Sequence, residues 1–257
     1  MSKDYIPGAE PLFIEGNEKG CLLFHGGGGG TTWDLKEFAG FLNAETGMTV
    51  WLPSLTGYGT RPEDLIGVEY DDWLKDAHNG LEKLLDVCRS VSVVGHSAGG
   101  LLSLLLASER EEVSSVVAWA APFGVRNRLL ALLPIISKTP LLRRAIPKKY
   151  HTEIPAWLKE QGWVGYDWIP ASIGLTVRDG MKRLRTALGR VTCPVLLVQG
   201  SKDESVTKDS PRSIAYRLAS KKKEIWIIEG AGHPMMNDER YKDALFARTV
   251  SFLLAND

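Results

Sequence analysis

The feature that most constrains the fold is a five-residue turn between an apolar run and an uncharged one. Residues 91–94 read Val-Ser-Val-Val, residues 95–99 read Gly-His-Ser-Ala-Gly, and residues 98–108 carry no charged side chain. A buried strand followed by a sharp Gly-x-Ser-x-Gly turn and a helix is the context that exposes a nucleophilic serine. The helix N-terminus also favours a developing negative charge. The pattern predicts Ser97 as a nucleophile, and the alternative is a glycine-rich turn that contains a serine by chance.

Short apolar runs recur along the chain and are typical of parallel strands covered on both faces. They are residues 21–24, 48–52, 91–94, 113–119, 195–199 and 224–228. Helical patterns separate them, at 70–88 and 98–108 and in three further segments. One of these starts with a capping box formed by Thr31 and Asp34, one with Ser210-Pro211, and the last with Asn237 as cap and an end near Leu254. The alternation predicts an α/β fold with a mostly parallel sheet flanked by helices.

The alternation breaks once, in a proline-containing stretch between residues 119 and 195 that shows no strand pattern. We interpret residues 122–190 as an inserted helical cap. Residues 1–121 and 191–257 would then form one core domain. The cap holds a leucine-rich run at 129–136 and four aromatic residues, Trp157, Trp163, Tyr166 and Trp168. These aromatic side chains are expected to form either the cap's own core or an apolar substrate pocket.

The balance of charges and the cysteine content indicate which classes of protein this sequence fits. Lys+Arg and Asp+Glu both number 31, so nothing suggests a nucleic-acid partner. The first residues lack a secretory pattern, and no apolar run reaches the ~18 residues of a membrane span. Cys21, Cys88 and Cys193 lie in apolar contexts and are expected to be reduced core thiols of a cytoplasmic protein.

The zero net charge hides a local division. Acidic residues dominate positions 63–86, and basic residues dominate 126–149. The two segments could face each other and seat the cap. The basic segment could instead meet an anionic lipid surface, although a solvated cap face is the more ordinary interpretation.

A nucleophilic serine needs a base, and the base needs an acid that orients it. Of the five histidines, His233 lies in Gly-Ala-Gly-His-Pro after the last predicted strand, where a loop can bring it over Ser97. His25 and His96 lie inside glycine motifs next to strands, His78 on a predicted helix and His151 in the predicted cap. We therefore predict His233 as the base.

The predicted acid is Asp203, which follows the strand at 195–199 at its first turn. Its neighbours Glu204 and Asp209 are interpreted as solvated loop charges. The chain order Ser97, Asp203, His233 is the order found in hydrolases whose nucleophilic serine lies on a Gly-x-Ser-x-Gly turn.

Two backbone N–H groups should stabilise the oxyanion of a tetrahedral intermediate. Ala98, directly after the nucleophile, is predicted to supply one. The glycine run at 26–30 should supply the other, through Gly27 or, as an alternative, Gly28. A phosphate-binding loop is the rival interpretation, but residues 31–33 are Thr-Thr-Trp and contain no lysine. The run could also be a spacer without function.

Together these residues resemble the α/β-hydrolase superfamily across nearly the whole chain. Several segments look like its bacterial carboxylesterase and monoacylglycerol lipase branch. They are Leu-Leu-Phe-His-Gly at 22–26, Pro-Ser-Leu-Thr-Gly-Tyr-Gly at 53–59, Asp-Asp-Trp-Leu-Lys-Asp at 71–76, the turn around Ser97, Gly200 with Asp203 and Val206, and Gly232-His233. The resemblance implies a small helical cap and hydrolysis of short- or medium-chain esters or monoacylglycerols, without a cofactor or metal. The glycine run departs from that branch and looks more like the glycine-rich loops of esterases that accept bulky alcohols.

Two classes of alternative stay open at this point. One is another hydrolase of the same fold, such as a serine aminopeptidase, a thioesterase or an enzyme that cleaves C–C bonds. The other is a non-catalytic binding protein on the same fold.

Overall fold

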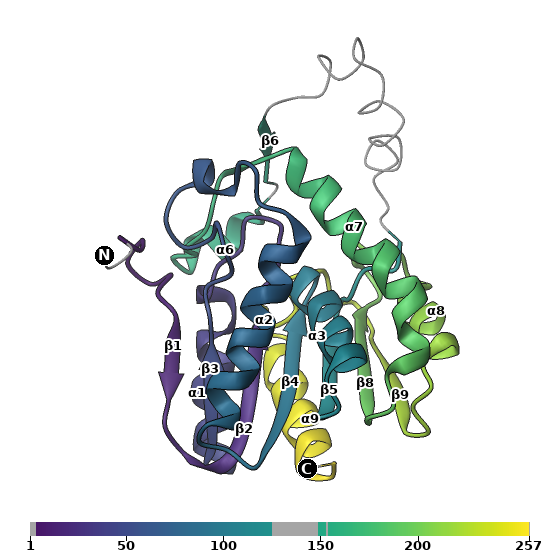
Figure 1. Ribbon diagram of the computed structural model, residues 1–257. Coiled ribbons are helices and arrows are strands. Elements are labelled where there is room, and N and C mark those ends of the chain that lie inside the picture. Colours follow the sequence, from purple (N-terminus) through teal and green to yellow (C-terminus); the bar gives the residue numbers. More distant parts are fainter. Residues whose placement is uncertain (1–3, 125–148, 153, 257) are drawn as a thin grey trace.

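The computed structural model describes residues 4–124, 149–152 and 154–256. Within them a seven-stranded sheet forms the centre of the molecule (Figure 1), in the order β1-β3-β2-β4-β5-β8-β9. Its strands are β1 (Leu12–Ile14), β2 (Asn17–Phe24), β3 (Met48–Leu52), β4 (Ser90–His96), β5 (Val113–Trp119), β8 (Val195–Gly200) and β9 (Lys223–Ile228). All neighbours run parallel except β1 and β3. The predicted mostly parallel sheet is confirmed.

All six predicted strands are present, and β1 is an addition. It pairs Leu12 with Leu52 and Ile14 with Val50 at the sheet edge, where its three residues are exposed or half-buried. A strand this short with only one neighbour needs no apolar run, so the sequence gives no signal for it.

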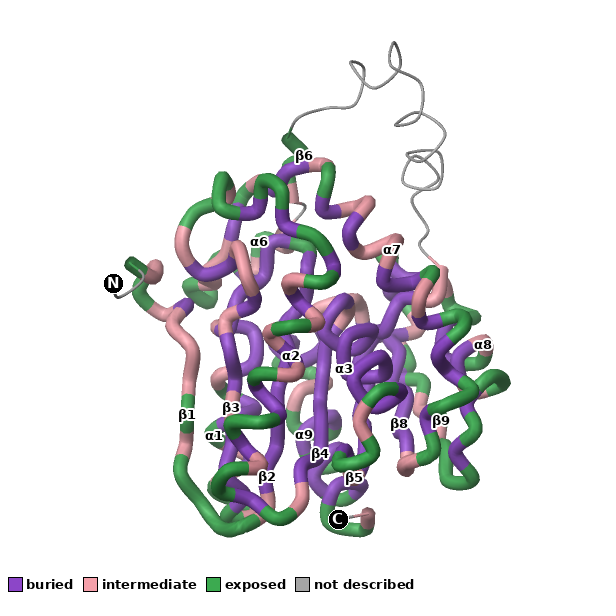
Figure 2. The backbone as a smooth tube through the Cα atoms, in the orientation of Figure 1, coloured by how far each residue is buried: buried purple, intermediate pink, exposed green. Residues whose placement is uncertain are grey.

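Helices cover both faces of the sheet, and the buried residues are concentrated along its central strands (Figure 2). One face is covered by α1 (Trp33–Thr46) and α9 (Lys242–Leu254), whose Phe38 and Phe246 rings lie 5.0 Å apart. The other face is covered by α2 (Tyr70–Leu85), α3 (Ala98–Glu109) and α8 (Ser210–Arg217), which share a second apolar cluster. Short 3₁₀ helices lie at η1 (Pro62–Leu65) and η2 (Leu188–Arg190).

Two predicted helix caps are wrong. The N-cap position of α1 is Thr32, while the Thr31 hydroxyl donates to the Val164 carbonyl at 2.6 Å. The final helix begins at Lys242, and the Asn237 side-chain amide donates to the Asp34 carbonyl at 3.2 Å. In both cases the side chain donates to a carbonyl distant in sequence instead of capping the helix at its N-cap position. The start of α8 at Ser210-Pro211 is as predicted.

The described part of residues 122–190 forms β6 (Lys149–His151), α6 (Ala156–Glu160), β7 (Trp168–Pro170) and α7 (Ser172–Ala187). Figure 1 shows β6 and the first turns of α7 beyond the carboxyl end of β4. The predicted absence of strands here is wrong, because β6 and β7 pair antiparallel with Tyr150 opposite Ile169. Three-residue strands are too short to show a period. The leucine-rich run at 129–136 and most of the basic segment lie outside the described residues.

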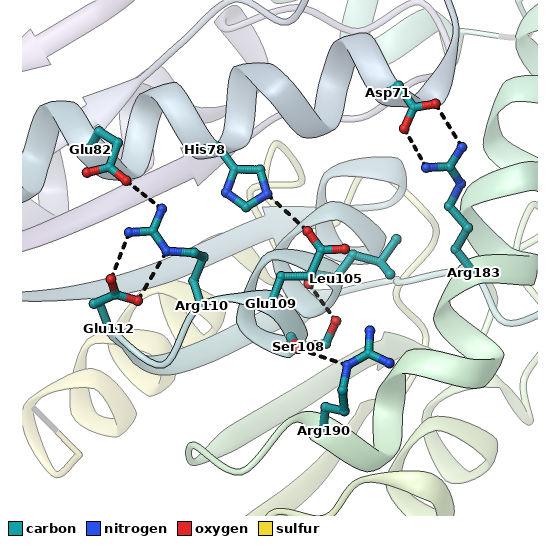
Figure 3. A network of polar contacts seen from close by, with 10 residues as sticks. All are labelled: Asp71, His78, Glu82, Leu105, Ser108, Glu109, Arg110, Glu112, Arg183 and Arg190. Atoms are coloured by element: carbon teal, nitrogen blue, oxygen red, sulfur yellow. Dashed lines mark hydrogen bonds and ion pairs between the residues drawn. The ribbon is translucent and has the colours of Figure 1, made fainter.

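The acidic segment 63–86 does contact the predicted cap, through α7 (Figure 3). Arg183 of α7 donates to both oxygens of Asp71, at 2.5 and 3.0 Å, and to Asp179 at 2.7 Å. These groups are partly solvated, so each pair contributes on the order of 0.2–1 kcal/mol. The larger contribution is buried packing, since Gly180 of α7 lies against the Tyr70 ring.

The rest of this polar network joins α2 and α3 near the surface (Figure 3). His78 bonds to Glu109 at 3.0 Å, and Arg110 bonds to Glu82 and Glu112. His78 is therefore a surface residue engaged in an ion pair or hydrogen bond, in agreement with its interpretation as a plain helix residue.

Two further sequence expectations concern thiols and membrane spans. Cys21, Cys88 and Cys193 form no disulfide. Cys21 and Cys88 are buried, and Cys193 is half-buried, so that burial raises the pKa of its thiol to about 11. Among the described helices, none combines the length and apolarity needed to cross a bilayer.

The tight contact at Gly180 makes a prediction about stability. A Cβ there would lie 2.3 Å from Tyr70 Cε2, so Gly180→Ala should destabilise the protein by about 1–3 kcal/mol through overpacking. Gly40 in α1 is a matched control, because its Cβ would meet no atom within 4 Å. Gly40→Ala should stabilise by about 0.5–1 kcal/mol. Urea unfolding measures the change in the free energy of unfolding for each variant. Equal changes in Gly180→Ala and Gly40→Ala would contradict the packing of α7 described above.

Candidate active site

Ser97 lies on a strained turn between β4 and α3. Its φ of 54° and ψ of −119° fall in a region that L-residues rarely adopt, and Ala120 is the other non-glycine residue with positive φ in the described chain. The flanking glycines make the turn possible. A Cβ on Gly95 would lie 2.2 Å from the Gly99 carbonyl oxygen, and one on Gly99 would lie 2.1 Å from the Phe24 carbonyl oxygen. The geometry is that of a serine displayed at the end of a central strand.

Asp203 and His233 form a direct pair. Asp203 is fully buried in the loop after β8, and His233 Nδ1 lies 2.7 Å from its Oδ2. A carboxylate only accepts, so Nδ1 carries the proton and Nε2 is left as the basic atom. This is the tautomer that a general base requires.

The Asp203 carboxylate is held ionised. Burial raises its pKa, but the hydrogen bond and charge of His233 outweigh burial, with help from the N–H groups of Val206 and Ser205, and the pKa lies below its ordinary value. Gln199 Nε2 also donates to Oδ2 at 2.7 Å. Sequence reasoning missed Gln199, although an amide at the end of an otherwise apolar strand was a signal.

His96 holds His233, the predicted base, beside the turn that carries Ser97. His96 Nε2 lies 3.1 Å from the His233 carbonyl oxygen, and the two rings are 4.7 Å apart. A carbonyl only accepts, so His96 carries its proton on Nε2, and burial lowers its pKa to about 3. Among the described contacts no hydrogen bond joins Ser97 Oγ to His233. Such bonds often tighten only when substrate binds.

The glycine loop crosses the N-terminus of α3 at Gly27. A Cβ there would lie 3.0 Å from Ala98 Cβ, and the Tyr58 hydroxyl donates to the Gly27 carbonyl at 2.7 Å. Neither Gly27 N–H nor Ala98 N–H bonds to another described residue. Gly28 is exposed, and its Cβ would meet nothing within 4 Å. The loop therefore approaches the residue after Ser97 at Gly27 rather than Gly28.

The other predicted candidates have different environments. His25 is buried and neutral: burial lowers its pKa to about 4, and it bonds to the Gly26 carbonyl and the Leu55 N–H. His151 is exposed in β6. Glu204 and Asp209 are exposed loop charges.

Asp34 is a buried acid near this site that sequence reasoning assigned to a helix cap. Its side chain accepts a hydrogen bond from Trp163 Nε1 at 2.9 Å. Burial raises its pKa to about 7, although the Trp163 hydrogen bond and the charge of His233 act in the opposite direction. Nothing in the local sequence separates such a residue from an ordinary cap.

In the described part of the chain, no group of three or more His, Cys, Asp or Glu side chains is arranged to hold a metal ion.

Comparisons with known proteins agree with this geometry. A family model described as alpha/beta hydrolase family matches residues 21–248. The chain is 29% identical over 237 residues to a thermostable monoacylglycerol lipase of Bacillus sp. (strain H-257), covering 91% of this chain and 90% of that protein. It is 24% identical over 245 residues to a carboxylesterase of Bacillus subtilis (strain 168), covering 95% and 96%.

Solved structures show the same fold. A metagenome-derived lipolytic enzyme, from a study of LipS and LipT, superposes with a TM-score of 0.87 at 25% identity, covering 98% of this chain and all of that one. A monoacylglycerol lipase of Paleococcus ferrophilus superposes with a TM-score of 0.79 at 19% identity, covering 96% and 99%.

The raised pKa of Asp34 predicts a pH-dependent stability. The folded protein binds this proton with a pKa of about 7 against an ordinary value of 3.8. Stability contributed by the protonated form is therefore complete below pH ~4 and is lost as the pH rises to about 7. Relative to Asp34→Asn, the wild type should lose on the order of 4 kcal/mol over this interval. Denaturant unfolding at pH 4–8 measures the difference, and a difference that stays constant with pH would refute the assignment.

Proposed function

The chain belongs to the alpha/beta hydrolase family and is an ester hydrolase, and we propose that Ser97, His233 and Asp203 carry out its reaction. The observation that carries this proposal is the convergence of two rare features. A strained serine lies at the end of β4, and the half-buried His233, paired with the buried Asp203, contacts His96 of the same turn. This combination supports a Ser-His-Asp arrangement for acyl transfer.

The first half-reaction forms an acyl-enzyme. His233 Nε2 takes the proton of Ser97 Oγ as the oxygen attacks the ester carbonyl carbon. Asp203 keeps the imidazole in the correct tautomer and stabilises the imidazolium. The N–H groups of Gly27 and Ala98 bind the oxyanion. The C–O bond to the alcohol then breaks, and the alcohol leaves with the proton from His233.

The second half-reaction returns the enzyme to its starting state. Water gives a proton to His233 Nε2 and attacks the acyl carbon. The tetrahedral intermediate collapses, Ser97 Oγ regains the proton, and the carboxylic acid leaves. No cofactor or metal enters either step.

The proposed substrates are small esters with a short or medium acyl chain, or monoacylglycerols. The names of the two Bacillus relatives, a monoacylglycerol lipase and a carboxylesterase, support monoacylglycerols and carboxylic esters as the substrate class. Tyr166 and Trp163 of the predicted cap pack on the core domain, so at least these two aromatic side chains serve the cap–core contact. A cytoplasmic location is proposed because Cys21, Cys88 and Cys193 form no disulfide.

Replacing the nucleophile tests the chemistry. Ser97→Ala should lower kcat for a p-nitrophenyl ester by at least about 10⁴-fold, because the attacking oxygen is lost. Ser213→Ala on α8 is the control and should keep wild-type turnover. Circular dichroism would verify that both variants fold. Wild-type-like turnover of Ser97→Ala would rule out the proposed nucleophile.

A substrate panel tests the proposed class. We expect the highest kcat/KM among p-nitrophenyl esters from acetate to decanoate and for a monoacylglycerol, with palmitate lower. Aminoacyl amides and acyl thioesters represent the alternative aminopeptidase and thioesterase functions. A kcat/KM for either that exceeds all esters by tenfold or more would replace the ester assignment.

A further inference from the structure

The glycine loop, residues 26–30, is costly to hold in one conformation. Glycine loses more backbone freedom on folding than any other residue, and this run contains nothing else. A hydrogen-bond donor for an oxyanion must nevertheless be placed within about 0.5 Å. Contacts from outside the loop must therefore fix it.

Residues 163–166 of the predicted cap make three hydrogen bonds here, one to the loop itself at Gly29 and two to the residues that follow it, Thr31 and Asp34. The Tyr166 N–H donates to the Gly29 carbonyl at 2.8 Å, and the Thr31 hydroxyl donates to the Val164 carbonyl at 2.6 Å. Trp163 Nε1 donates to Asp34 Oδ1 at 2.9 Å. Donors and acceptors thus alternate between the two segments.

The fit between the segments is close. Gly29 has a φ of 95°, and a Cβ there would lie 2.8 Å from the Tyr166 carbonyl oxygen. A Cβ on Gly30 would lie 2.1 Å from Asp34 Oδ2, so the Asp34 side chain folds back against the loop. Only a glycine backbone fits between these groups.

Tyr166 also acts on the other end of the loop, through contacts that pass by way of Tyr58. Its ring stacks on Tyr58, with centroids 6.0 Å apart and planes at 11°. The Tyr58 hydroxyl donates to the Gly27 carbonyl at 2.7 Å, and burial raises the pKa of Tyr58 so that it keeps its proton. Tyr166 is itself fixed, because its hydroxyl accepts from Thr60 N–H at 3.0 Å.

We propose that residues 163–166 form a clamp that sets the conformation of the glycine loop, and that Trp163 and Tyr166 are positioning residues for the reaction at Ser97. The inference rests on the proposed function, because Gly27 N–H is taken as an oxyanion donor. The inserted segment then has a role in catalysis besides any role in substrate choice.

A positioning role differs measurably from mere attachment of the cap. The oxyanion carries its full charge only in the transition state, so a displaced donor lowers kcat and leaves KM nearly unchanged. Loss of cap attachment alone would lower thermal stability or change KM.

The decisive variants remove side-chain hydrogen bonds and keep the packing. Trp163→Phe loses the bond to Asp34, and Thr31→Val loses the bond to Val164 together with a 3.3 Å bond accepted from the Trp33 N–H. Trp163→Phe removes the indole N–H, and Thr31→Val removes the hydroxyl at nearly constant shape. Trp226→Phe is the matched control, since Trp226 lies in β9 on the sheet, away from the predicted cap, and its indole nitrogen bonds to no other described residue. Loss of a whole oxyanion donor costs about 10²–10³-fold in kcat, so a loosened donor should cost about tenfold.

We therefore expect kcat to fall about tenfold in Trp163→Phe and in Thr31→Val, with KM within about threefold of wild type. Inhibition by a trifluoromethyl ketone, which adds to a serine and places an oxyanion in the hole, should weaken by the same factor. Trp226→Phe should change neither quantity.

Hydrogen exchange of the backbone amides at 26–32 separates the possible failures. Faster exchange in Trp163→Phe and Thr31→Val, but not in Trp226→Phe, supports the clamp. Unchanged exchange in both variants overturns it, whatever residue is the nucleophile. Faster exchange with unchanged kcat overturns the positioning role. Activity retained in Ser97→Ala would instead overturn the proposed function. The hydrogen-exchange result would still decide whether residues 163–166 hold the glycine loop.

Discussion

The positive φ of Ser97 is the constraint on which the rest of the site depends. The turn reverses the chain from β4 into α3 so tightly that Gly95 and Gly99 lie against neighbouring carbonyl groups. Strain of this kind costs roughly 1–3 kcal/mol and persists only where the surroundings enforce it. Here β4 is hydrogen-bonded to β2 and β5 on either side, and the Ser97 N–H donates to the Trp119 carbonyl at 2.7 Å. The sheet centre thus fixes the serine.

The order of the strands then determines which loops reach that serine. The loop after β2 carries the glycine run, and β2 is a direct neighbour of β4. The loops after β8 and β9 carry Asp203 and His233, and these two strands are paired with Gly200 opposite Ile228. Parallel strands end at the same edge of the sheet, so residues far apart in sequence meet there. His233 is held next to the Ser97 turn by its contact with His96, which is itself part of that turn.

The core of this arrangement was predictable from local sequence, because each part is a short apolar run followed by a characteristic loop. The six strands and the placement of Ser97, Asp203 and His233 at strand ends followed from that pattern. Residues whose partners are distant in sequence were not predictable. Thr31 and Asn237 looked like helix caps, yet their side chains bond to Val164 and Asp34. The strands β1, β6 and β7 are too short to show a period. The boundaries of the cap at 122 and 190 stay a prediction.

Of the two oppositely charged segments, only the acidic one lies wholly within the described residues, so contact between the acidic and the basic segment stays a prediction. The acidic segment meets α7 through Asp71 and Arg183, so charge does contribute where the predicted cap contacts the core.

The central claim is the nucleophile, and covalent labelling tests it most directly. After reaction with a fluorophosphonate, peptide mass spectrometry should find one adduct, on Ser97, and none in Ser97→Ala. An adduct on another residue, or no adduct on the folded wild-type protein, would contradict the account.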